Sequence, residues 1–445
     1  MFDREIRDPI HRTIGVTAEE VAFIDHPYVQ RLRHVRQLGL SYLVYPGATH
    51  DRFSHSIGAM HVVGLMWSAV TDRGEVLTER FDAATLRRLG RLLRLAALLH
   101  DIGHPPFSHV SEMFLPDFAK LDFPRSWLRE EGKPKRRARH EDMSVVLIRD
   151  LASGDEALLD ETDAQDIASL VHAEVKPSDR WHRDFGVDDQ GLHALLKSFV
   201  SGELDCDRMD YLLRDAYMAG TVYGNYDMDR LVNSQGIEEH RGRLVRFVDT
   251  SAIRSFEDFL LARYHMFLQV YLHKTSVGFD VCLGEAVRSG EFDLQLPTDA
   301  AAYAGLRDST VLERWHEAAK FPENQWSRRL ARREPLKLVI AAERTRPGDE
   351  ELLGQVGRVL EEAGVRGYEV SSKHYLSRMP LSSSDGMLYA RRKLLGRPVL
   401  EPMARYSDLL KKYNEQIRVT HLYVRREDWS GVSERLAGLD VRGAG

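Results

Sequence analysis

Four polar residues in separate segments of the chain have the types that bind metals. His100 and Asp101 are adjacent at the end of the apolar run LAALL, His55 lies upstream in DRFSHSIG, and Asp207 lies downstream in ELDCDRMDYLLRD. Two imidazoles and two carboxylates form a mixed ligand set that suits one divalent metal such as Mn, Fe, Zn or Ni, and suits Mg less well. A metal that prefers six ligands then keeps open positions for water or a phosphate oxygen, as reactive sites do.

Each of these residues also has an ordinary structural interpretation. A histidine on a helix is more often satisfied by a hydrogen bond than by a metal, and an adjacent His-Asp pair often occurs by chance. The position of the pair favours a metal, because charge at the end of a fully apolar helix requires a compensating partner.

The segment 203–217, which we expect to be helical, carries groups suited to a sugar phosphate. Asp207, Tyr211 and Asp215 recur every four residues and therefore share one face, and Arg208 lies beside them. Carboxylates accept hydrogen bonds from sugar hydroxyls, and guanidinium groups bind anionic oxygens. The alternative is a solvated face that carries pairs of opposite charge.

A second helix is expected over the long amphipathic segment 251–281. Arg263, Tyr271 and Lys274 fall on a related face of it, and Arg52 lies just before the first metal-binding histidine. Several cations near a metal suit a polyphosphate. The alternative is that these cations cover helix surfaces, as most of the 62 basic residues must do.

Three further histidines are candidates for proton transfer. His104 and His109 follow the His-Asp pair within one predicted loop, and His140 precedes two acidic residues. Imidazole titrates near neutral pH, so any of the three can protonate a leaving oxygen. Their spacing along the chain leaves open which one reaches a substrate.

The elements that must position these residues are mainly helices. Helical periodicity dominates the chain up to about residue 324, and the apolar helix that leads into His100 should be central and buried. Beyond it, LKLVIAAE and IRVTHLYV predict strands, GYEVSS predicts a weaker strand, and residues 349–363 predict a helix. We therefore expect a mainly α fold, with an all-helical core at 1–324 and a smaller α+β domain at 325–445 that serves oligomerisation or regulation.

Composition narrows the class of protein. The net charge of −6 argues against a global polycation that binds nucleic acid. Two cysteines exclude a disulfide framework and a cysteine-based zinc finger. The charged start MFDREIRDPIHR is unlike a signal peptide, and no segment approaches the roughly 18 apolar residues of a membrane span. A cytoplasmic protein without a membrane partner is expected.

An ordered series of motifs over residues 1–290 carries a resemblance to a known family. The series is DPIHR, QRLRHVRQLG, YPGATHDRFSHSIG, HDIGHPPFSH, RHEDMS, DCDRMDYLLRD and RYHMFLQVYLHK. It resembles the HD-domain deoxynucleoside triphosphate triphosphohydrolases, in particular the branch with the vertebrate enzyme that has a sterile-alpha-motif domain. The resemblance implies an all-helical catalytic core that cleaves a dNTP into a deoxynucleoside and inorganic triphosphate.

Roles are carried over motif by motif. The resemblance implies that the two histidines and two aspartates above bind the metal, and that further Mg accompanies the triphosphate. It implies that His140 protonates the leaving 5′ oxygen with Glu112 as an acidic helper, and that His104 and His109 lie near the α-phosphate. It also implies phosphate contacts by Arg52, Arg208, Arg263 and Lys274, 3′-hydroxyl contacts by Gln37 and Asp215, a base or sugar neighbour in Leu38, a sugar-pocket position for Tyr211, and crowding of the 2′ carbon by Tyr271. Arg208 stands where the vertebrate enzyme has Lys.

The resemblance also implies a second nucleotide site. In the vertebrate enzyme, nucleotides bound between subunits drive tetramer assembly, and Asp25, Gln30 and Arg33 match part of that pocket. Arg4 stands near a position held there by Lys. A nucleotide effector and a homo-oligomer, either a dimer or a tetramer, follow as expectations. The ordinary interpretation of QRLR is a surface helix that pairs with acidic neighbours.

Two alternatives remain open at this point. One is a metal phosphohydrolase that acts on nucleoside monophosphates or cyclic dinucleotides, although no GYP triplet follows the His-Asp pair and the many cations exceed what a monophosphate needs. The other is a protein that binds nucleic acid or other partners and has a vestigial site. It rests on the basic cluster KPKRRARH at 133–140, whose ordinary interpretation is a solvated loop.

Overall fold

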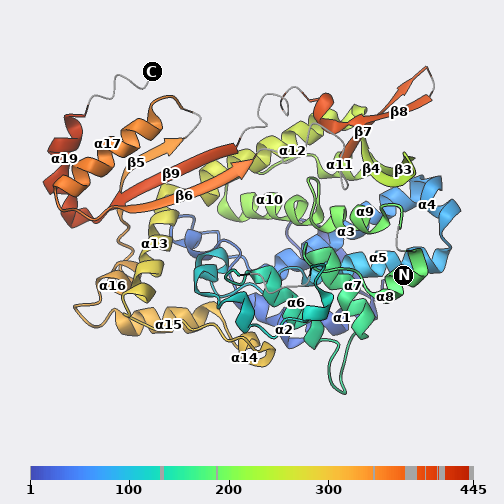
Figure 1. The fold of residues 1–445 in the computed structure, drawn as a ribbon, viewed down its shortest axis with the longest axis horizontal. Coiled ribbons are helices and arrows are strands. Elements are labelled where there is room, and N and C mark those ends of the chain that lie inside the picture. Colours follow the sequence, from blue (N-terminus) through green and yellow to red (C-terminus); the bar gives the residue numbers. More distant parts are fainter. Residues whose placement is uncertain are drawn as a thin grey trace.

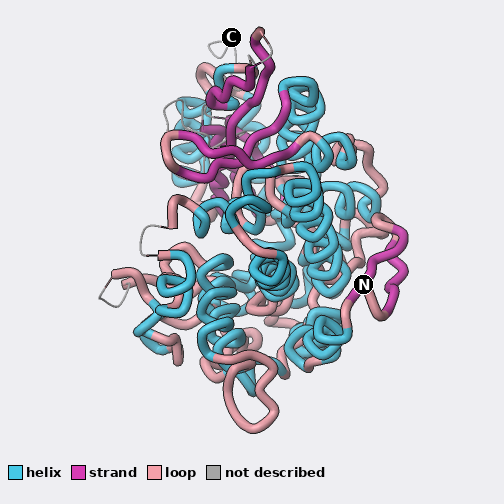
Figure 2. The backbone as a smooth tube through the Cα atoms, turned by 90° about the vertical axis from the view of Figure 1, so that its right-hand side faces the viewer, coloured by secondary structure: helices cyan, strands magenta, loops and turns pink. Residues whose placement is uncertain are grey.

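The computed structural model describes residues 2–439 except 131–134, 187–188, 344–345, 376–387, 396, 408 and 410–415. Residues 133 and 134 of the basic cluster therefore lie outside the described residues. The expected mainly α fold is confirmed: helices form the body of the molecule, and most strands gather at one end of it (Figure 2).

Most helices belong to the part of the chain that carries the predicted site (Figure 1). They are α1 (Ala18–Asp25), α2 (Pro27–Gln30), α3 (Arg52–Arg73), α4 (Glu75–Arg80), α5 (Ala83–Leu99), α6 (His140–Asp150), α7 (Glu161–Val171), α8 (Asp179–Phe185), α9 (Leu192–Val200), α10 (Cys206–Ala219), α11 (Met228–Asn233), α12 (Ile253–Met266), α13 (Lys274–Arg288), α14 (Ala300–Ala304), α15 (Asp308–Ala318) and α16 (Gln325–Ala331). Two further helices, α17 (Asp349–Glu362) and α19 (Trp429–Ala437), lie near the C-terminus.

Helix α5 is the central element, as its apolar sequence predicts. Asp82 caps its N-terminus by accepting a 2.7 Å hydrogen bond from the backbone N–H of Thr85. All five residues from Leu95 to Leu99 are fully buried, and α5 packs against α3, α7 and α9. The helix ends at His100, so its buried stem delivers the His-Asp pair to a fixed point in the core.

The predicted helix over 251–281 is wrong in one respect: it is two helices with a break. A π-helical segment, Phe267–Tyr271, follows α12, and the ring of His273 caps α13. Arg263, Tyr271 and Lys274 consequently come from three successive segments rather than from one face. Apolar periodicity does not reveal a π-turn, because the widened turn adds a residue without removing the apolar pattern around it.

Strands form three sheets. Their bounds are β1 (Arg4–Asp8), β2 (Arg12–Val16), β3 (Gln235–His240), β4 (Arg243–Asp249), β5 (Lys337–Glu343), β6 (Tyr368–Tyr375), β7 (Leu388–Leu394), β8 (Arg397–Pro402) and β9 (Gln416–Val424). The hairpin β1–β2 stands alone, β3-β4-β7-β8 form a mixed sheet in which β4 and β7 are parallel, and β5-β9-β6 form an antiparallel sheet.

The C-terminal part contains the strands and the helix that its sequence predicts. Helices α17 and α19 pack through Val356, Leu360 and Val432 against Leu422 and Val424 of β9. The helical part differs from expectation by two hairpins, β1–β2 and β3–β4. Because β4 pairs with β7, one sheet joins strands from both sides of residue 324, and the division into 1–324 and 325–445 remains a prediction.

Among the described residues, no helix combines the length and the apolar character that a membrane crossing needs.

Candidate active site and metal centre

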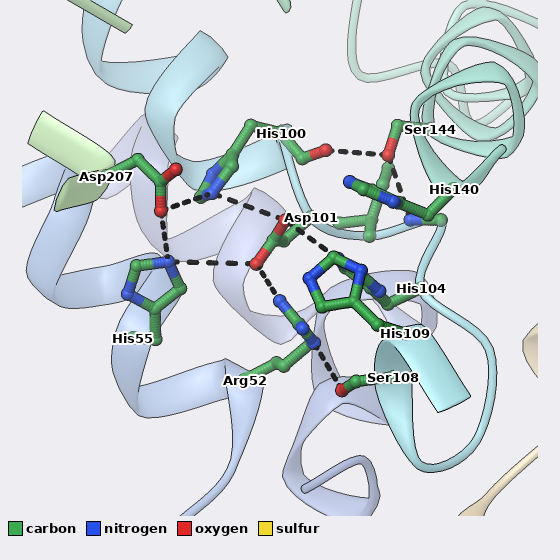
Figure 3. Close-up of polar contacts among 12 residues, drawn as sticks. Arg52, His55, His100, Asp101, His104, Ser108, His109, His140, Ser144 and Asp207 are labelled. Carbon is green, nitrogen blue, oxygen red and sulfur yellow. Dashed lines mark hydrogen bonds and ion pairs between the residues drawn. The ribbon is translucent and has the colours of Figure 1, made fainter. Parts of the chain in front are cut away.

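Three helices bring the predicted metal ligands to one point (Figure 3). His55 lies on the first turn of α3, His100 and Asp101 end α5, and Asp207 lies on the first turn of α10. The Oδ1 atom of Asp207 is 3.1 Å from Nε2 of His55 and 3.6 Å from Nε2 of His100. The carboxylate of Asp101 is 3.7 Å from Nε2 of His55 and 3.4 Å from Nε2 of His100.

The two histidines present the same nitrogen to this point. The Nδ1 of His55 lies 2.7 Å from Oδ2 of Asp210, and the Nδ1 of His100 lies 2.7 Å from the carbonyl oxygen of Ala97. Each Nδ1 therefore carries the proton, which leaves Nε2 as a lone-pair donor. Both Nε2 atoms are buried without a hydrogen-bond partner among the described residues. Unpartnered imidazole nitrogens beside carboxylates fit a divalent metal ion.

The electrostatics of the cluster favour positive charge. Burial raises the pKa of Asp207, but the neighbouring rings of His100 and His55 outweigh it and hold that pKa well below its ordinary value. Burial lowers the pKa of His55, but the carboxylates of Asp207 and Asp210 outweigh it and raise that pKa to about 10. A divalent cation supplies the positive charge that these carboxylates otherwise draw from protons.

A buried arginine borders the four predicted metal ligands, which we call the metal cluster. Arg52 lies one turn before His55 on α3, so both side chains face the same way. Its Nη1 forms an ion pair with Asp101, and its Nε donates a 2.7 Å hydrogen bond to Oγ of Ser108. The guanidinium group is thereby held beside the position of the metal, where it can meet an anionic oxygen.

Next to the metal cluster, three histidines converge on one carboxylate. The Oε1 of Glu112 is 2.7 Å from Nδ1 of His109, 2.7 Å from Nδ1 of His140 and 3.7 Å from Nδ1 of His104. The rings of His104 and His140 stack with centroids 3.7 Å apart. Burial lowers the pKa of His140, but the hydrogen bond and charge of Glu112 outweigh it, so the pKa is raised overall. The carboxylate therefore favours the protonated form of His140.

Gly103 allows the two clusters to approach each other. A Cβ atom at this position would lie 2.2 Å from the carbonyl oxygen of His140 and 2.2 Å from the backbone nitrogen of Ser144. The start of α6, which carries His140, therefore packs directly on the backbone that follows the His-Asp pair. Ser144 completes the contact by donating a 2.7 Å hydrogen bond to the carbonyl of His100.

The residues expected to bind a sugar form a polar wall next to the metal cluster. Tyr271 donates a 2.8 Å hydrogen bond to Oδ2 of Asp215, and Oδ1 of Asp215 lies 2.7 Å from Nε2 of His50. The carbonyl of His50 accepts a 3.0 Å hydrogen bond from the backbone of Gln37, whose Oε1 is buried and unpartnered among the described residues. Tyr211 lies between Tyr271 and the predicted metal ligand His55, with its ring centroid 6.1 Å from that of Tyr271 and 6.4 Å from that of His55. Leu38 is half-buried next to Gln37.

Arg208 and Arg263, two of the predicted phosphate-binding cations, have acidic partners in the structure. Arg208 pairs with Asp205 and with the carbonyl of Gly202, and Arg263 lies 3.1 Å from a carboxylate oxygen of Glu203. Lys274 is the exposed first residue of α13. A polyphosphate would exchange these carboxylate contacts for its own anionic oxygens.

Three of the four residues of the predicted effector site lie together. Gln30 donates a 2.7 Å hydrogen bond to the carbonyl of Ile24, which precedes Asp25, and Arg33 donates a 2.9 Å hydrogen bond to Gln30. Arg4 lies on β1, in a separate hollow lined by Phe2, Thr13 and His61. No described contact joins Arg4 to the other three.

Two arginines of the basic cluster, Arg136 and Arg137, form contacts within the chain. Arg136 lies 2.6 Å from a carboxylate oxygen of Asp142 and also pairs with Glu174, and Arg137 donates to the carbonyl of Met113. These contacts favour the ordinary interpretation of the cluster over a nucleic-acid site.

Sequence reasoning missed Asp210, the buried anchor of the metal cluster. Its carboxylate accepts hydrogen bonds from Arg214 at 2.8 and 2.9 Å, and it lies 2.6 Å from His11 and 2.7 Å from His55. The available signal was its spacing, three residues after Asp207 and four before Arg214, on the inward face of α10. His11 sits in the DPIHR motif, but its partner is 199 residues away.

Comparisons with known proteins agree with this geometry. Residues 52–212 match the HD domain family, a segment that runs from the start of α3 into α10. A protein of Aquifex aeolicus described as hypothetical has a solved structure with a TM-score of 0.72 and 27% sequence identity, covering 98% of this chain and 100% of that one.

Two curated relatives show the range of the similarity. An uncharacterised protein of Methanocaldococcus jannaschii is 32% identical over 282 residues, which are 63% of this chain and 49% of the relative. The deoxynucleoside triphosphate triphosphohydrolase SAMHD1 homolog of Dictyostelium discoideum is 30% identical over 336 residues, 73% of this chain and 57% of the relative. The chain thus spans about half the length of these curated relatives.

Proposed function

Because residues 52–212 form an HD domain, we propose that this protein is a metal-dependent phosphohydrolase that cleaves dNTPs into deoxynucleosides and inorganic triphosphate. One observation carries the proposal: a four-residue ligand set with two unpartnered Nε2 atoms lies beside a histidine whose protonated form Glu112 favours. The polar wall of Tyr271 and Asp215 next to it suits a sugar. The similarity to relatives named as dNTP triphosphohydrolases supports the choice of substrate.

In this proposal His55, His100, Asp101 and Asp207 hold one divalent metal, and further Mg arrives with the triphosphate. A bound divalent metal polarises phosphorus–oxygen bonds and lowers the pKa of water. The donor set admits Mn, Fe, Zn, Ni or Mg, so the identity of the metal is a matter for elemental analysis of purified protein.

Arginines and histidines of the site orient the phosphates. Arg52, fixed by Ser108, faces the α-phosphate together with His104 and His109. Arg208 and Arg263 bind the outer phosphates after they leave their acidic partners, and the exposed Lys274 binds them as well. Such charge-assisted contacts fix the chain of phosphates in the geometry that the reaction requires.

His140 supplies the proton for the leaving 5′ oxygen. Its Nδ1 is bound to Glu112, which leaves the proton on Nε2 as the one that can be donated. Glu112 favours this imidazolium and fixes its ring, and the stacked ring of His104 limits its rotation.

A change at Glu112 should shift the pH profile in a defined direction. In Glu112→Gln the amide no longer raises the pKa of His140, so burial dominates and that pKa falls. The acid form is then lost at lower pH, and the alkaline limb of kcat against pH moves toward acid. Stopped assays from pH 5 to 9 measure the shift. Glu361→Gln, at an exposed position of α17, is the matched control. An unchanged limb in Glu112→Gln contradicts the role of His140.

Tyr271 should decide between deoxyribose and ribose. Asp215 and Gln37 hold the 3′-hydroxyl, Tyr211 and Leu38 border the sugar, and the ring of Tyr271 occupies the space beside the 2′ carbon. Tyr271→Ala opens that space, and we expect the ratio of dGTP to GTP hydrolysis to fall by about tenfold, as for other pockets that reject one small group. Tyr271→Phe keeps the ring, loses only the bond to Asp215, and should retain most of the discrimination. Equal ratios in wild type and Tyr271→Ala contradict this assignment.

The decisive experiment is product analysis. The protein is incubated with Mn and with each of the four dNTPs, singly and mixed, alongside the matching ribonucleotides and dAMP, and products are separated by chromatography. Deoxynucleoside plus triphosphate is the expected outcome. Orthophosphate from dAMP with untouched dNTPs would overturn it in favour of a monophosphate hydrolase.

The same experiment tests an effector. Activity that requires a mixture of nucleotides would support an activating site at Asp25, Gln30 and Arg33, with Arg4 as an outlying member. Size-exclusion chromatography with and without nucleotide then reports whether the chain forms a dimer or a tetramer. Activity with each dNTP alone, and an unchanged elution volume, would remove the effector from the proposal.

A further inference from the structure

The loop that follows the metal ligands has an unusual backbone at its end. Phe107 and Ser108 have φ angles of 58° and 59°, in the left-handed region that residues with a Cβ atom rarely adopt. Two such residues in succession persist only where surrounding groups enforce the conformation. This turn lies between His104 and His109, two of the histidines assigned to the reaction.

Helix α15 supplies the groups that enforce the turn. Its first residue, Asp308, accepts a 2.7 Å hydrogen bond from the backbone N–H of Phe107 and a 3.0 Å hydrogen bond from that of Arg36. Trp315, two turns later on α15, stacks on the ring of Phe107 with centroids 5.4 Å apart and planes 16° apart. The side chains of Phe107, Asp308 and Trp315 are buried. Asp308 thus connects the turn to the start of α15, which lies 201 residues after Phe107.

The Phe107–Ser108 turn also sets the position of Arg52. Oγ of Ser108 accepts a 2.7 Å hydrogen bond from Nε of Arg52 and donates a 2.6 Å hydrogen bond to the carbonyl of Arg36. Arg52 also forms an ion pair with Asp101, as Figure 3 shows. Asp308 accepts hydrogen bonds from the backbone of both Arg36 and Phe107. It therefore fixes Arg36, whose carbonyl accepts from the Ser108 hydroxyl, and Phe107, which precedes Ser108.

The first half of the loop is held by other groups. Nη2 of the buried Arg31 donates hydrogen bonds of 2.7 Å to the carbonyls of Ile102 and His104, and Tyr303 donates one of 2.7 Å to the carbonyl of Gly103. These bonds do not involve Asp308. Loss of the Asp308 carboxylate should therefore loosen the Phe107–Ser108 turn while residues 102–104 and the metal ligands stay in place.

We infer that Asp308 is a positioning residue for the proposed reaction, because it holds the Phe107–Ser108 turn. The turn fixes Ser108, which orients Arg52 toward the phosphate. The turn also places His109 beside Glu112. Asp308 touches neither substrate nor metal. The reaction it serves is the one proposed above, so the inference rests on that function for its kinetic consequence but not for its structural one.

The test compares Asp308→Asn with Glu313→Gln, which removes one carboxylate charge from an exposed position of the same helix. Asparagine keeps the shape of the side chain but places an NH2 group against one of the two backbone N–H groups. We expect kcat for triphosphate release to fall about 10- to 100-fold, as misplacement of a catalytic group by about 1 Å does. Metal content per chain should equal that of wild type, and Glu313→Gln should behave as wild type. An unchanged kcat in Asp308→Asn overturns the inference.

A double-mutant cycle separates positioning from general loss of stability. If Asp308 acts in part through Ser108, then Asp308→Asn combined with Ser108→Ala should lower kcat by less than the product of the two single losses. Independent effects would multiply, and a multiplied loss overturns the route through Ser108.

Hydrogen exchange tests the structural part without any substrate. Residues 105 and 106 are prolines, so a peptide over 105–110 reports the amides from Phe107 onward. In Asp308→Asn we expect these amides to exchange about tenfold faster, while the amides of 102–104 keep the wild-type rate. Equal rates over 107–110 in both proteins overturn the inference, even if the wild type cleaves no dNTP. Faster exchange in a protein that cleaves no dNTP would instead refute the proposed function alone.

Discussion

His100→Ala is expected to remove both the metal and the activity. Nε2 of His100, like Nε2 of His55, is a buried imidazole nitrogen without a hydrogen-bond partner among the described residues, and it lies 3.6 Å from Oδ1 of Asp207. Loss of the metal withdraws several kcal/mol of charge stabilisation, so dNTP hydrolysis should fall by about 1000-fold or more. Elemental analysis of the dialysed protein gives the metal content directly.

Thermal unfolding provides a second measurement for His100→Ala. Wild type should gain about 2.7 kcal/mol of stability when the free metal is at 100 times its Kd, and the variant should gain far less. His193→Ala is the matched control, since His193 is a buried histidine that contacts Ser169 and lies on α9, outside the cluster. A His100→Ala protein that keeps its metal and its hydrolysis rate would refute the assigned ligand set.

Asp210→Asn is expected to weaken the fold and the metal site together. The carboxylate is fully buried and contacts His11, His55 and the Nε and Nη2 atoms of Arg214. The asparagine NH2 would face these donors, and the Arg214 guanidinium would lose its main buried partner. Breaking a buried pair in this way costs about 3–5 kcal/mol of unfolding free energy. Urea denaturation measures this loss.

The effect of Asp210→Asn on the metal has a separate cause. Without a carboxylate at Nδ1, His55 is no longer held as the tautomer that presents Nε2, and metal affinity should fall about 10- to 100-fold. Metal titration of the folded variant measures this term. Asp229→Asn, an exposed aspartate on α11, is the control. Wild-type metal affinity in Asp210→Asn would show that the tautomer of His55 is fixed by some other contact.

Gly58 offers an independent route to the same pair. A Cβ atom there would lie 1.9 Å from Oδ1 of Asp210 and 2.4 Å from Nη2 of Arg214. Gly58→Ala should therefore reproduce a milder form of both losses without changing any polar group. A Gly58→Ala protein as stable as wild type would show that the pair has room to move.

Local patterns were sufficient for much of the architecture. The apolar run before His100 predicts a central helix, and Leu95 to Leu99 are indeed fully buried. The β-branched segments after residue 324 predict strands at β5 and β9. Such features depend on neighbours within a few residues, which a single sequence displays. The sequence also shows that His55, His100, Asp101 and Asp207 are of metal-binding types, but their convergence from three helices is a property of the packed chain.

Contacts between distant segments were decided only by the tertiary structure. The π-helical segment Phe267–Tyr271, which follows α12, leaves the apolar pattern intact, so periodicity predicts one helix. Asp210 and Asp308 have no motif of their own, because a buried carboxylate is defined by the donors that surround it. Apart from Arg214, those donors come from distant segments, such as His55, 155 residues from Asp210, and Arg36, 272 residues from Asp308.

By itself, then, the sequence determined which side chains are available for metal binding and proton transfer, since residue type and helix position are local properties. The tertiary structure decided which proton each histidine keeps, which carboxylates are charged and where Arg52 points. The physical reason is that pKa, tautomer and orientation depend on burial and on partners, and both arise only when the chain is packed. The His-Asp pair at the end of α5 becomes a candidate catalytic centre through groups as remote as α10 and α15.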